Sequence, residues 1–376
     1  MLTSLVWSWT SSLALSATPP GFPPALKPGC LPKDSQTDLF CPGDATYACY
    51  KIPTLLRHSS GVLLALIEAR KYSCDDHGYV DLRSRRSLDS GKTWSTSSLV
   101  YGNSTGETEW TTVGDANVVE DTTSGVIWML HTRNNSQLFL SHSKDVGVSW
   151  SMPLDVSATL RHGGGAGTGH AGGIQLSSGP HTGRLLLPVY SGGPYCVYSD
   201  DHGASWHMGD VVSGPGAGEW AIAETGAFAA DGTPILLGSR RNSPPSGQPF
   251  KGYRLQTLSY DGGVTWGKQW EETQLPEPIS GCEGSLVWHP GQHLLFFAHP
   301  NPQYDLFRSS LTIWSSANLG ASWEEHAVVW PEAAGYSSLV VMGNSSTADL
   351  GVFYDRNNHT MIVFEAQSVT FTTIAT

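Results

Sequence analysis

The chain has 376 residues and a formal net charge of −12, and only 14% of its residues are charged. A nucleic-acid-binding protein needs a basic surface, so this balance argues against nucleic acid as a partner. It also repels anionic ligands on average, so any anion site must be a local cluster of Arg or Lys. The 42 glycines and 14 tryptophans are typical of a turn-rich globular protein that buries a core.

The first segment, Leu2–Ala17, is apolar and rich in Ser and Thr, and a Pro-rich stretch follows it. We interpret residues 1–17 as a signal peptide; because no basic residue precedes the apolar run, a truncated or disordered leader is the alternative. No later stretch approaches the roughly 20 continuous apolar residues of a membrane span. We therefore expect a secreted protein, or one in the lysosomal or endomembrane lumen. Four Asn-x-Ser/Thr triplets fit this expectation: Asn103, Asn134, Asn344 and Asn358.

Residues 18–46 are rich in Pro and Gly and have no sustained periodicity, which predicts an irregular N-terminal strap. The six cysteines lack Cys-x-x-Cys spacing, so no metal site is indicated. Three of them, Cys30, Cys41 and Cys49, lie in or beside the strap, where a disulfide could fasten it. Fifteen pairings of the six cysteines are possible, and the sequence does not choose among them.

A pattern of the form Ser-x-Asp-x-Gly-x-Ser/Thr-Trp recurs along most of the chain. The Asx side chain can bond nearby backbone, the Gly provides a positive φ, and the Trp can bury its ring between neighbouring sheets. Start-to-start spacings are 56, 56, 60 and 57 residues. Five copies at nearly constant spacing indicate a structural repeat with one hairpin turn per unit. The copies begin at Ser87, Ser143, Ser199, Ser259 and Ser316, and in the last Asn318 replaces the Asp.

Short apolar runs bounded by turn residues, such as Val62–Ile67 and Leu185–Val189, recur once per unit and are typical of strands. Strand-like sequence after Trp323 supplies most of a further unit, including residues 361–366, and an N-terminal strand would complete it. We therefore predict an all-β, six-bladed β-propeller with Asp-box (BNR) repeats, formed as one domain by residues 47–376. The Gly-rich segment Gly163–Gly173 is expected to be a loop.

Propeller ligands bind where loops from several blades converge at the centre, so polar residues at corresponding blade positions are the candidates for a site. Such residues flank the predicted strands: Lys51, Glu68, Arg70, Asp75, Asp76, Glu219, Arg240, Arg308 and Tyr336.

From Tyr47 to Ala366 the chain resembles the exo-α-sialidase (neuraminidase) family, including its animal lysosomal and cytosolic members. The resemblance rests on Tyr-Lys-Ile-Pro at 50–53, where the family has Tyr-Arg-Ile-Pro, on the Asp boxes, on Glu-Ala-Arg at 68–70 and on Gly-Tyr-Ser-Ser-Leu at 335–339. It implies an enzyme that removes terminal sialic acid, or the related sugar Kdn, from sialylated glycans with retention of configuration. It implies a covalent tyrosyl-glycosyl intermediate and no cofactor.

The resemblance assigns Tyr336 as nucleophile and Glu219 as its base. The anomeric carbon of a sialic acid carries a carboxylate, so a neutral phenol approaches it without the repulsion that an Asp or Glu would meet. A phenol is a poor nucleophile unless a base takes its proton. Glu224 is the alternative base; a strand alternates its faces, so only one of the two can face the site. We prefer Glu219.

By the same resemblance Asp76 is the acid/base carboxylate that protonates the leaving oxygen and later deprotonates water. Asp75, its neighbour, is the rival. Because the first step needs protonated Asp76, we expect an acidic pH optimum.

The family's carboxylate clamp maps to Lys51, Arg240 and Arg308, with Arg70 as a further cationic residue and Glu68 as its orienter. Lys51 stands where the family has Arg, which keeps the charge but loses the bidentate grip of a guanidinium. Arg241 could replace Arg240, but strand alternation predicts that it faces away. Two further functions stay open: a sialic-acid-binding propeller with weak or no activity, because of Lys51, and a structural Asp-box propeller in protein sorting.

Overall fold

The computed structural model of the protein describes residues 36–103, 111–214, 218–243, 252–302, 308–343, 345–356 and 368–376. The predicted signal peptide, residues 1–17, lies outside these ranges. Within them the regular structure is all strand except for one 3-10 turn, η1 (Asp44–Thr46), which confirms the all-β class. None of the helical structure described is long and apolar enough to cross a membrane.

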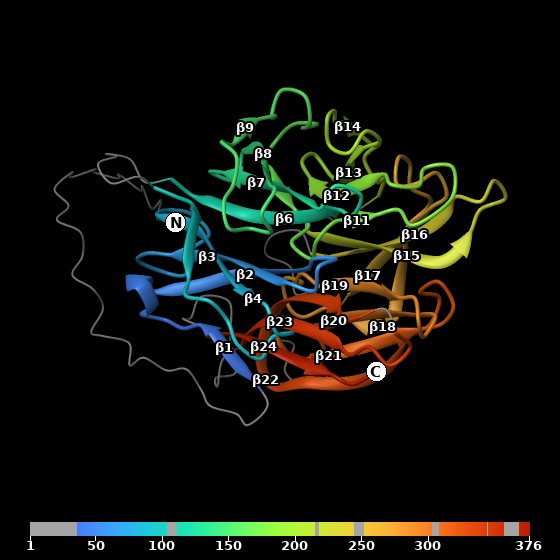
Figure 1. The fold of residues 1–376 in the computed structure, drawn as a ribbon. Coiled ribbons are helices and arrows are strands. Elements are labelled where there is room, and N and C mark those ends of the chain that lie inside the picture. The colour runs from blue at the N-terminus through green and yellow to red at the C-terminus, as the bar shows by residue number, and fades with distance from the viewer. Residues whose placement is uncertain are drawn as a thin grey trace, which may run out of the picture.

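The strands form five hydrogen-bonded sheets, arranged around a common centre in Figure 1. The first four sheets follow one another along the chain. The first sheet consists of β2 (Cys49–Arg57), β3 (Leu63–Arg70), β4 (Val80–Ser87) and β5 (Ser98–Tyr101), and the second of β6 (Val113–Asp121), β7 (Val126–Arg133), β8 (Gln137–Ser143) and β9 (Leu154–Asp155). The third consists of β10 (Gly167–Thr168), β11 (Ile174–Gln175), β12 (Leu185–Tyr190), β13 (Pro194–Ser199) and β14 (His207–Met208). The fourth consists of β15 (Trp220–Phe228), β16 (Pro234–Arg240), β17 (Tyr253–Ser259) and β18 (Trp270–Pro276).

The fifth sheet has seven strands and contains both ends of the described chain. Its order is β1 (Thr37–Phe40), β24 (Ser368–Ile374), β23 (Leu350–Arg356), β22 (Glu324–Val341), β21 (Ser309–Ser316), β20 (Leu294–Pro300) and β19 (Ser285–His289). The 18-residue β22 pairs with β21 along its first part and with β23 along its second, so two four-stranded units share it.

The N-terminal strap is more regular than predicted where it is described. Thr37–Phe40 forms β1, because its backbone pairs with the free edge of β24, and Asp44–Thr46 forms η1. The expectation that an N-terminal strand completes the last unit is confirmed. The strand expected at 361–366 lies outside the described residues. A disulfide joins Cys49 to Cys74 in the first sheet, and Cys41 is also disulfide-bonded, which fastens the end of the strap.

The Asp boxes form the predicted turns. In the first, Ser87 Oγ accepts the Gly91 N–H at 2.8 Å and Asp89 accepts the Thr93 N–H at 2.8 Å. The same contacts recur in the other four boxes, with Asn318 acting for Asp in the last. Gly91 has φ 87°, and a Cβ there would lie 2.2 Å from Phe371 of β24, so only glycine fits.

These box glycines also link neighbouring sheets. Gly147, Gly203, Gly263 and Gly320 lie against Leu64, Trp128, Leu186 and Leu237, each in the sheet that precedes its own, while Gly91 of the first box lies against the last sheet. Each turn therefore packs on the sheet before it, and the first sheet meets the last.

Three inner strands are irregular at the same end. The pairing register shifts after Lys51 in β2, after Gly114 in β6 and between Ala334 and Ser337 in β22. Such bulges re-aim side chains and are common beside active sites. Strand β2 contacts both β6 and β22, so the three bulges bring polar residues of separate sheets to one place.

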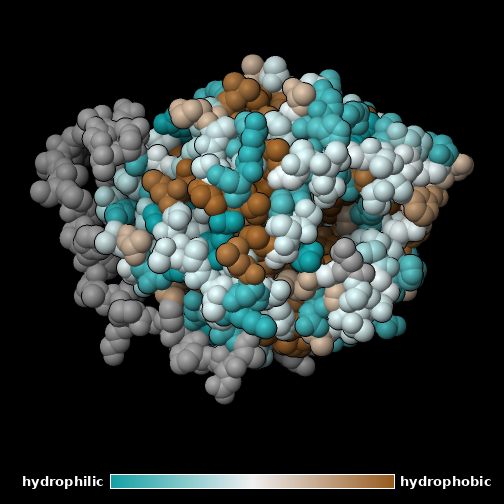
Figure 2. Space-filling view, in the orientation of Figure 1, coloured by the Kyte–Doolittle hydropathy of each residue, from teal (hydrophilic) through white to brown (hydrophobic). Residues whose placement is uncertain are grey.

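Figure 2 shows apolar side chains gathered along the middle of the face in view, with hydrophilic residues around them. The polar site described below lies at one end of the inner strands. One expectation fails at the surface: Asn103 is buried and its amide donates to Asp81, so this triplet is not a glycan acceptor in the folded chain.

Candidate active site

A cavity of about 740 Å³ opens where the three bulged strands meet. The rival carboxylates do not line this cavity: Asp75 accepts a hydrogen bond from Ser73 Oγ at 2.7 Å, and Glu224 accepts two from Ser177, at 2.8 and 2.7 Å. Strand alternation therefore separates Glu219 from Glu224 as predicted. All eight predicted site residues line the cavity: Lys51, Glu68, Arg70, Asp76, Glu219, Arg240, Arg308 and Tyr336.

Tyr336 and Glu219 form the centre of the site. The Tyr336 hydroxyl donates a hydrogen bond to Glu219 Oε1, and both side chains are buried. Burial, together with the charge of Glu219, raises the pKa of Tyr336 well above its usual range. Burial would also raise the pKa of Glu219, but the charge of Arg241 outweighs it and holds that pKa at about 2. The pair is therefore a neutral phenol against an ionised carboxylate.

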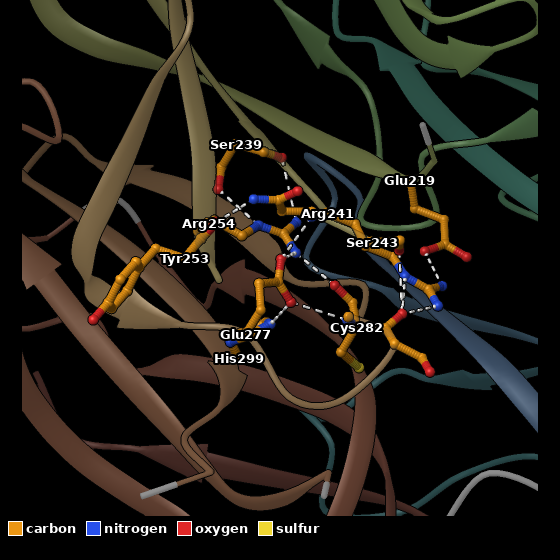
Figure 3. Close-up of polar contacts among 12 residues, drawn as sticks. Glu219, Ser239, Arg241, Ser243, Tyr253, Arg254, Glu277, Cys282 and His299 are labelled. Atoms are coloured by element: carbon orange, nitrogen blue, oxygen red, sulfur yellow. Dashed lines mark hydrogen bonds and ion pairs between the residues drawn. The ribbon is translucent and has the colours of Figure 1, made fainter. Parts of the chain in front are cut away.

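Arg241 faces this pair, so the prediction that it faces away was wrong. It lies one residue past the end of β16, and although its N–H still pairs with Glu219 O at 2.9 Å, both it and Arg240 line the cavity. Its Nη1 donates to Glu219 Oε2 at 2.7 Å (Figure 3). The same nitrogen donates to Tyr336 Oη at 3.0 Å, and Nη2 donates to Ser280 O at 2.7 Å.

Arg240 lies in the cavity as well. It is only 2% exposed, and its Nε and Nη1 find no hydrogen-bond partner within the described ranges. Burial lowers the pKa of Arg240 to about 10. A buried cation without a partner is costly, so the position suits an anionic ligand.

Arg308 and Lys51 are the other two cations of the predicted clamp. The Arg308 guanidinium lies over the Tyr336 ring at 5.2 Å and donates to Gly281 O at 2.9 Å. Lys51 is 7% exposed, and burial lowers its pKa to about 8, although the charge of Asp355 opposes this. Asp355, which sequence reasoning missed, accepts the Gly335 N–H at 2.8 Å and so holds the strand beside Tyr336.

Asp76 reaches the cavity from the loop between β3 and β4. Arg70 Nη1 donates to it at 2.7 Å, while Arg70 Nη2 donates to Glu68 at 2.7 Å. Desolvation by the surrounding cavity wall would raise the pKa of Asp76, but its side chain is 70% exposed, and the charge and hydrogen bond of Arg70 outweigh this effect and lower the pKa. Glu68 therefore orients Arg70, and Arg70 holds Asp76 in its ionised form.

Two buried residues behind the pair were not predicted. The His170 ring stacks on Tyr336 with centroids 5.8 Å apart, and burial lowers its pKa to about 4, so it is neutral. Asp115 lies at the β6 bulge, where burial raises its pKa well above the usual range. Their sequence surroundings carry no motif, because their placement depends on a bulge and a loop. In the part of the chain described, no group of three His, Cys, Asp or Glu residues could hold a metal.

Comparison with known proteins identifies the family to which the chain belongs. Residues 61–352 match the family described as BNR repeat-like domain. A sialidase of Micromonospora viridifaciens is 28% identical over 87% of this chain and 53% of its own length, so the chain spans about half of that relative. A sialidase of Clostridium perfringens is 25% identical over 82% of this chain and 87% of its own.

Among solved structures, the Hadza microbial sialidase Hz136 superposes with a TM-score of 0.73 at 22% identity, covering 90% of this chain and 68% of that one. This likeness supports the fold. The family match covers most of the chain and includes all five Asp boxes and Tyr336. The chain therefore belongs to the BNR repeat-like domain family, and its curated relatives there are sialidases.

Proposed function

We propose that the protein is a retaining exo-α-sialidase that hydrolyses terminal sialic acid, or Kdn, from glycoproteins, glycolipids and oligosaccharides. The observation that carries the proposal is the hydrogen bond from the Tyr336 hydroxyl to the ionised Glu219 in a cavity lined by cations. A buried neutral phenol beside a carboxylate base is the arrangement needed to attack an anomeric carbon that bears its own negative charge. The sialidase relatives support the same reaction.

In the proposed first step the Tyr336 oxygen bonds to the anomeric carbon and its proton passes to Glu219. The bond to the leaving oxygen breaks, and Asp76 gives its proton to that oxygen; because Arg70 holds Asp76 ionised in the free protein, Asp76 must first take up this proton from solvent. In the second step water attacks the anomeric carbon, Asp76 takes the water proton, and the Tyr336 oxygen leaves and recovers its proton from Glu219. Each carboxyl group thus returns to its starting state.

The substrate carboxylate is proposed to bind between Lys51, Arg240 and Arg308. Arg240 has a buried guanidinium with Nε and Nη1 unsatisfied within the described residues, which an incoming carboxylate would satisfy. Lys51 contributes charge without a bidentate grip.

We further propose that the sheets form a six-bladed propeller. The shared strand β22 divides the seven-stranded sheet into two units, which with the other four sheets makes six. The contact of Gly91 with Phe371 supports closure of the ring between its first and last units. A secreted or lysosomal location accords with the disulfide Cys49–Cys74, since disulfides persist in oxidising compartments.

A second candidate is a propeller that binds sialylated glycans and hydrolyses them poorly. Lys51 favours this candidate, because an ammonium in place of a guanidinium lacks the bidentate grip on a carboxylate. The retained Tyr336, Glu219 and Asp76 favour the enzyme, since a binding protein needs no nucleophile.

The two candidates separate in one assay. Release of methylumbelliferone from its α-glycosides of N-acetylneuraminic acid and Kdn is measured for the wild type, Tyr336→Phe and Lys51→Arg. Hydrolysis by the wild type that Tyr336→Phe loses supports the sialidase, and the better sugar identifies the substrate. An inactive wild type, with activity gained in Lys51→Arg, supports the binding protein.

A further inference from the structure

We infer that Glu277, a buried carboxylate outside the cavity lining, is a positioning residue that holds Arg241 against the Tyr336–Glu219 pair. The inference rests on the proposed function, because it assigns a role to a residue that acts through the catalytic pair. It follows from a network of hydrogen bonds around Glu277 (Figure 3). The network joins Asn242, the residue after Arg241, to the turn before Cys282, on which the Arg241 guanidinium rests.

The Glu277 carboxylate accepts hydrogen bonds from the backbone of both segments. Its Oε1 accepts the Asn242 N–H at 2.9 Å, and Asn242 is the residue that follows Arg241. Its Oε2 accepts the Cys282 N–H at 3.0 Å. One carboxylate thus ties the backbone just after Arg241 to the turn that precedes Cys282.

That turn supplies the carbonyls on which the arginines rest. Ser280 O accepts from Arg241 Nη2 at 2.7 Å and from Nε at 3.2 Å, and Gly281 O accepts from Arg308 Nη2 at 2.9 Å. Ser280 and Gly281 both have positive φ, 68° and 67°, so the turn is held in an unusual conformation. Glu277 therefore fixes both the main chain of Arg241 and the carbonyl that anchors its guanidinium.

The charge of Glu277 is compensated inside the fold. Arg254 Nη1 lies 3.2 Å from Oε1 and His299 Nε2 lies 3.1 Å from Oε2, and all three side chains are buried. Arg254 also donates to Cys282 O at 2.5 Å, which ties the same turn a second time. Burial would raise the pKa of Glu277, but the charge of Arg254 outweighs it and the pKa lies at about 2.

Stability alone does not explain this network. A buried ion pair is often no more stabilising than apolar residues of the same shape, because its charges must leave water. Glu277 makes four hydrogen bonds, two with backbone N–H groups of separate segments and two with the side chains of Arg254 and His299, and both segments lead to Arg241 or Arg308. We therefore interpret the Glu277 network as fixing the position of the Arg241 side chain.

The test is a double-mutant cycle on the full chain, with kcat and KM measured on the methylumbelliferyl glycoside. An amide at position 277 cannot accept from both N–H groups, so Glu277→Gln is expected to lower kcat by about 10- to 100-fold. KM is expected to rise as well, because Gly281 of the same turn anchors Arg308. In an Arg241→Met background the same change is expected to lower kcat by less than about threefold, since the route through Arg241 is already lost.

Glu120→Gln is the matched control. Glu120 also accepts a backbone N–H, from Ser59 at 2.8 Å, and pairs with His58 at 3.1 Å, but it lies at the far end of β6 from the cavity. This variant is expected to retain kcat. If Glu277→Gln does not fold, Glu277→Asp replaces it, because Asp keeps the charge that Arg254 and His299 require but is too short to reach both N–H groups.

An unchanged kcat in Glu277→Gln, or an equal loss with and without Arg241, overturns the inference. Wild-type hydrolysis that Tyr336→Phe abolishes secures the proposed function beforehand, so these results would count against Glu277 alone. If the wild type hydrolyses neither sugar, the proposed function fails and a crystal structure of Glu277→Gln decides. Arg241 displaced from Glu219 would support the inference, and Arg241 unmoved would overturn it.

Discussion

The Tyr336 hydroxyl donates its hydrogen bond to Glu219, a residue 117 positions earlier in the chain and in a different sheet. The donor and the acceptor of the proposed proton transfer are therefore aligned before any substrate binds. Burial, together with the charge of Glu219, raises the pKa of Tyr336, so the phenol stays protonated until attack begins. Proton transfer and attack must then occur together.

Arg241 is predicted to control the acid side of the pH profile. Arg241 is the charge that contributes most to lowering the pKa of Glu219 to about 2. Arg241→Met removes this charge, so the pKa of Glu219 rises and the base becomes protonated at a higher pH. Loss of a charged hydrogen bond is also expected to lower kcat by about 10- to 100-fold. The measurement is kcat/KM from strongly acidic to neutral pH. Arg241→Lys, which keeps the charge, should shift the acid limb less; an acid limb that stays in place in Arg241→Met would refute this role.

Lys51 is predicted to set the alkaline limit of substrate capture. Burial lowers its pKa to about 8 from 10.5, so the ammonium is charged below that pH and neutral above it. The affinity for a carboxylate, and with it kcat/KM, should fall as the pH rises through about 8. Lys51→Arg should remove this limb, because a guanidinium stays charged throughout. Identical alkaline limbs in the two proteins would show that another group titrates there.

Asp76 is predicted to matter most for substrates with poor leaving groups. Asp76→Asn removes the proton donor, so hydrolysis of a sialylated oligosaccharide should fall by about 100- to 10,000-fold. An aryl glycoside needs little protonation and should lose far less. Asp75→Asn is the control and should leave both substrates unaffected, since Asp75 is exposed and bonded to Ser73. Equal losses on the two substrates would count against an acid role for Asp76.

The disulfide Cys49–Cys74 is predicted to support both stability and the position of Asp76. Arg70, which bonds Asp76, also donates to Cys74 O at 2.6 Å. The disulfide therefore anchors the loop between β3 and β4 at the residue that Arg70 contacts. Replacing both cysteines by Ala should lower the free energy of unfolding by about 3 kcal/mol. Urea unfolding measures this loss. The kcat on a sialylated oligosaccharide should fall as well, and an unaltered kcat would mean that the loop needs no such fastening.

The repeat was readable from sequence because each Asp box encodes its own turn. The contacts of Ser87, Asp89 and Gly91 join residues only four positions apart, so they can be predicted without knowing the rest of the fold. Glu219 and Glu224 point in different directions for a similar reason, because β15 is regular from Trp220 to Glu224 and Glu219, the residue before it, still pairs through its carbonyl with the Arg241 N–H at 2.9 Å.

The same parity argument failed for Arg241 because it was extended past the end of β16. Asp115 and Asp355 were missed because one lies at a bulge and the other acts through the backbone of Gly335. Glu277 could not be found at all: its hydrogen bonds join residues 35 and 5 positions away, and nothing in their spacing signals a shared carboxylate. Site residues that are positioned by irregular backbone can be identified only from the structure.

The most direct test of the account is to find which residue becomes covalently attached to the sugar. A sialic acid with fluorines at carbons 2 and 3 destabilises the positively charged transition state and slows hydrolysis of any glycosyl-enzyme intermediate. The protein is incubated with this compound, digested and examined by mass spectrometry. The account predicts one added sugar on the peptide that carries Tyr336, and none in Tyr336→Phe. A sugar attached to Glu219 or Asp76, or an active enzyme that never acquires one, would contradict it.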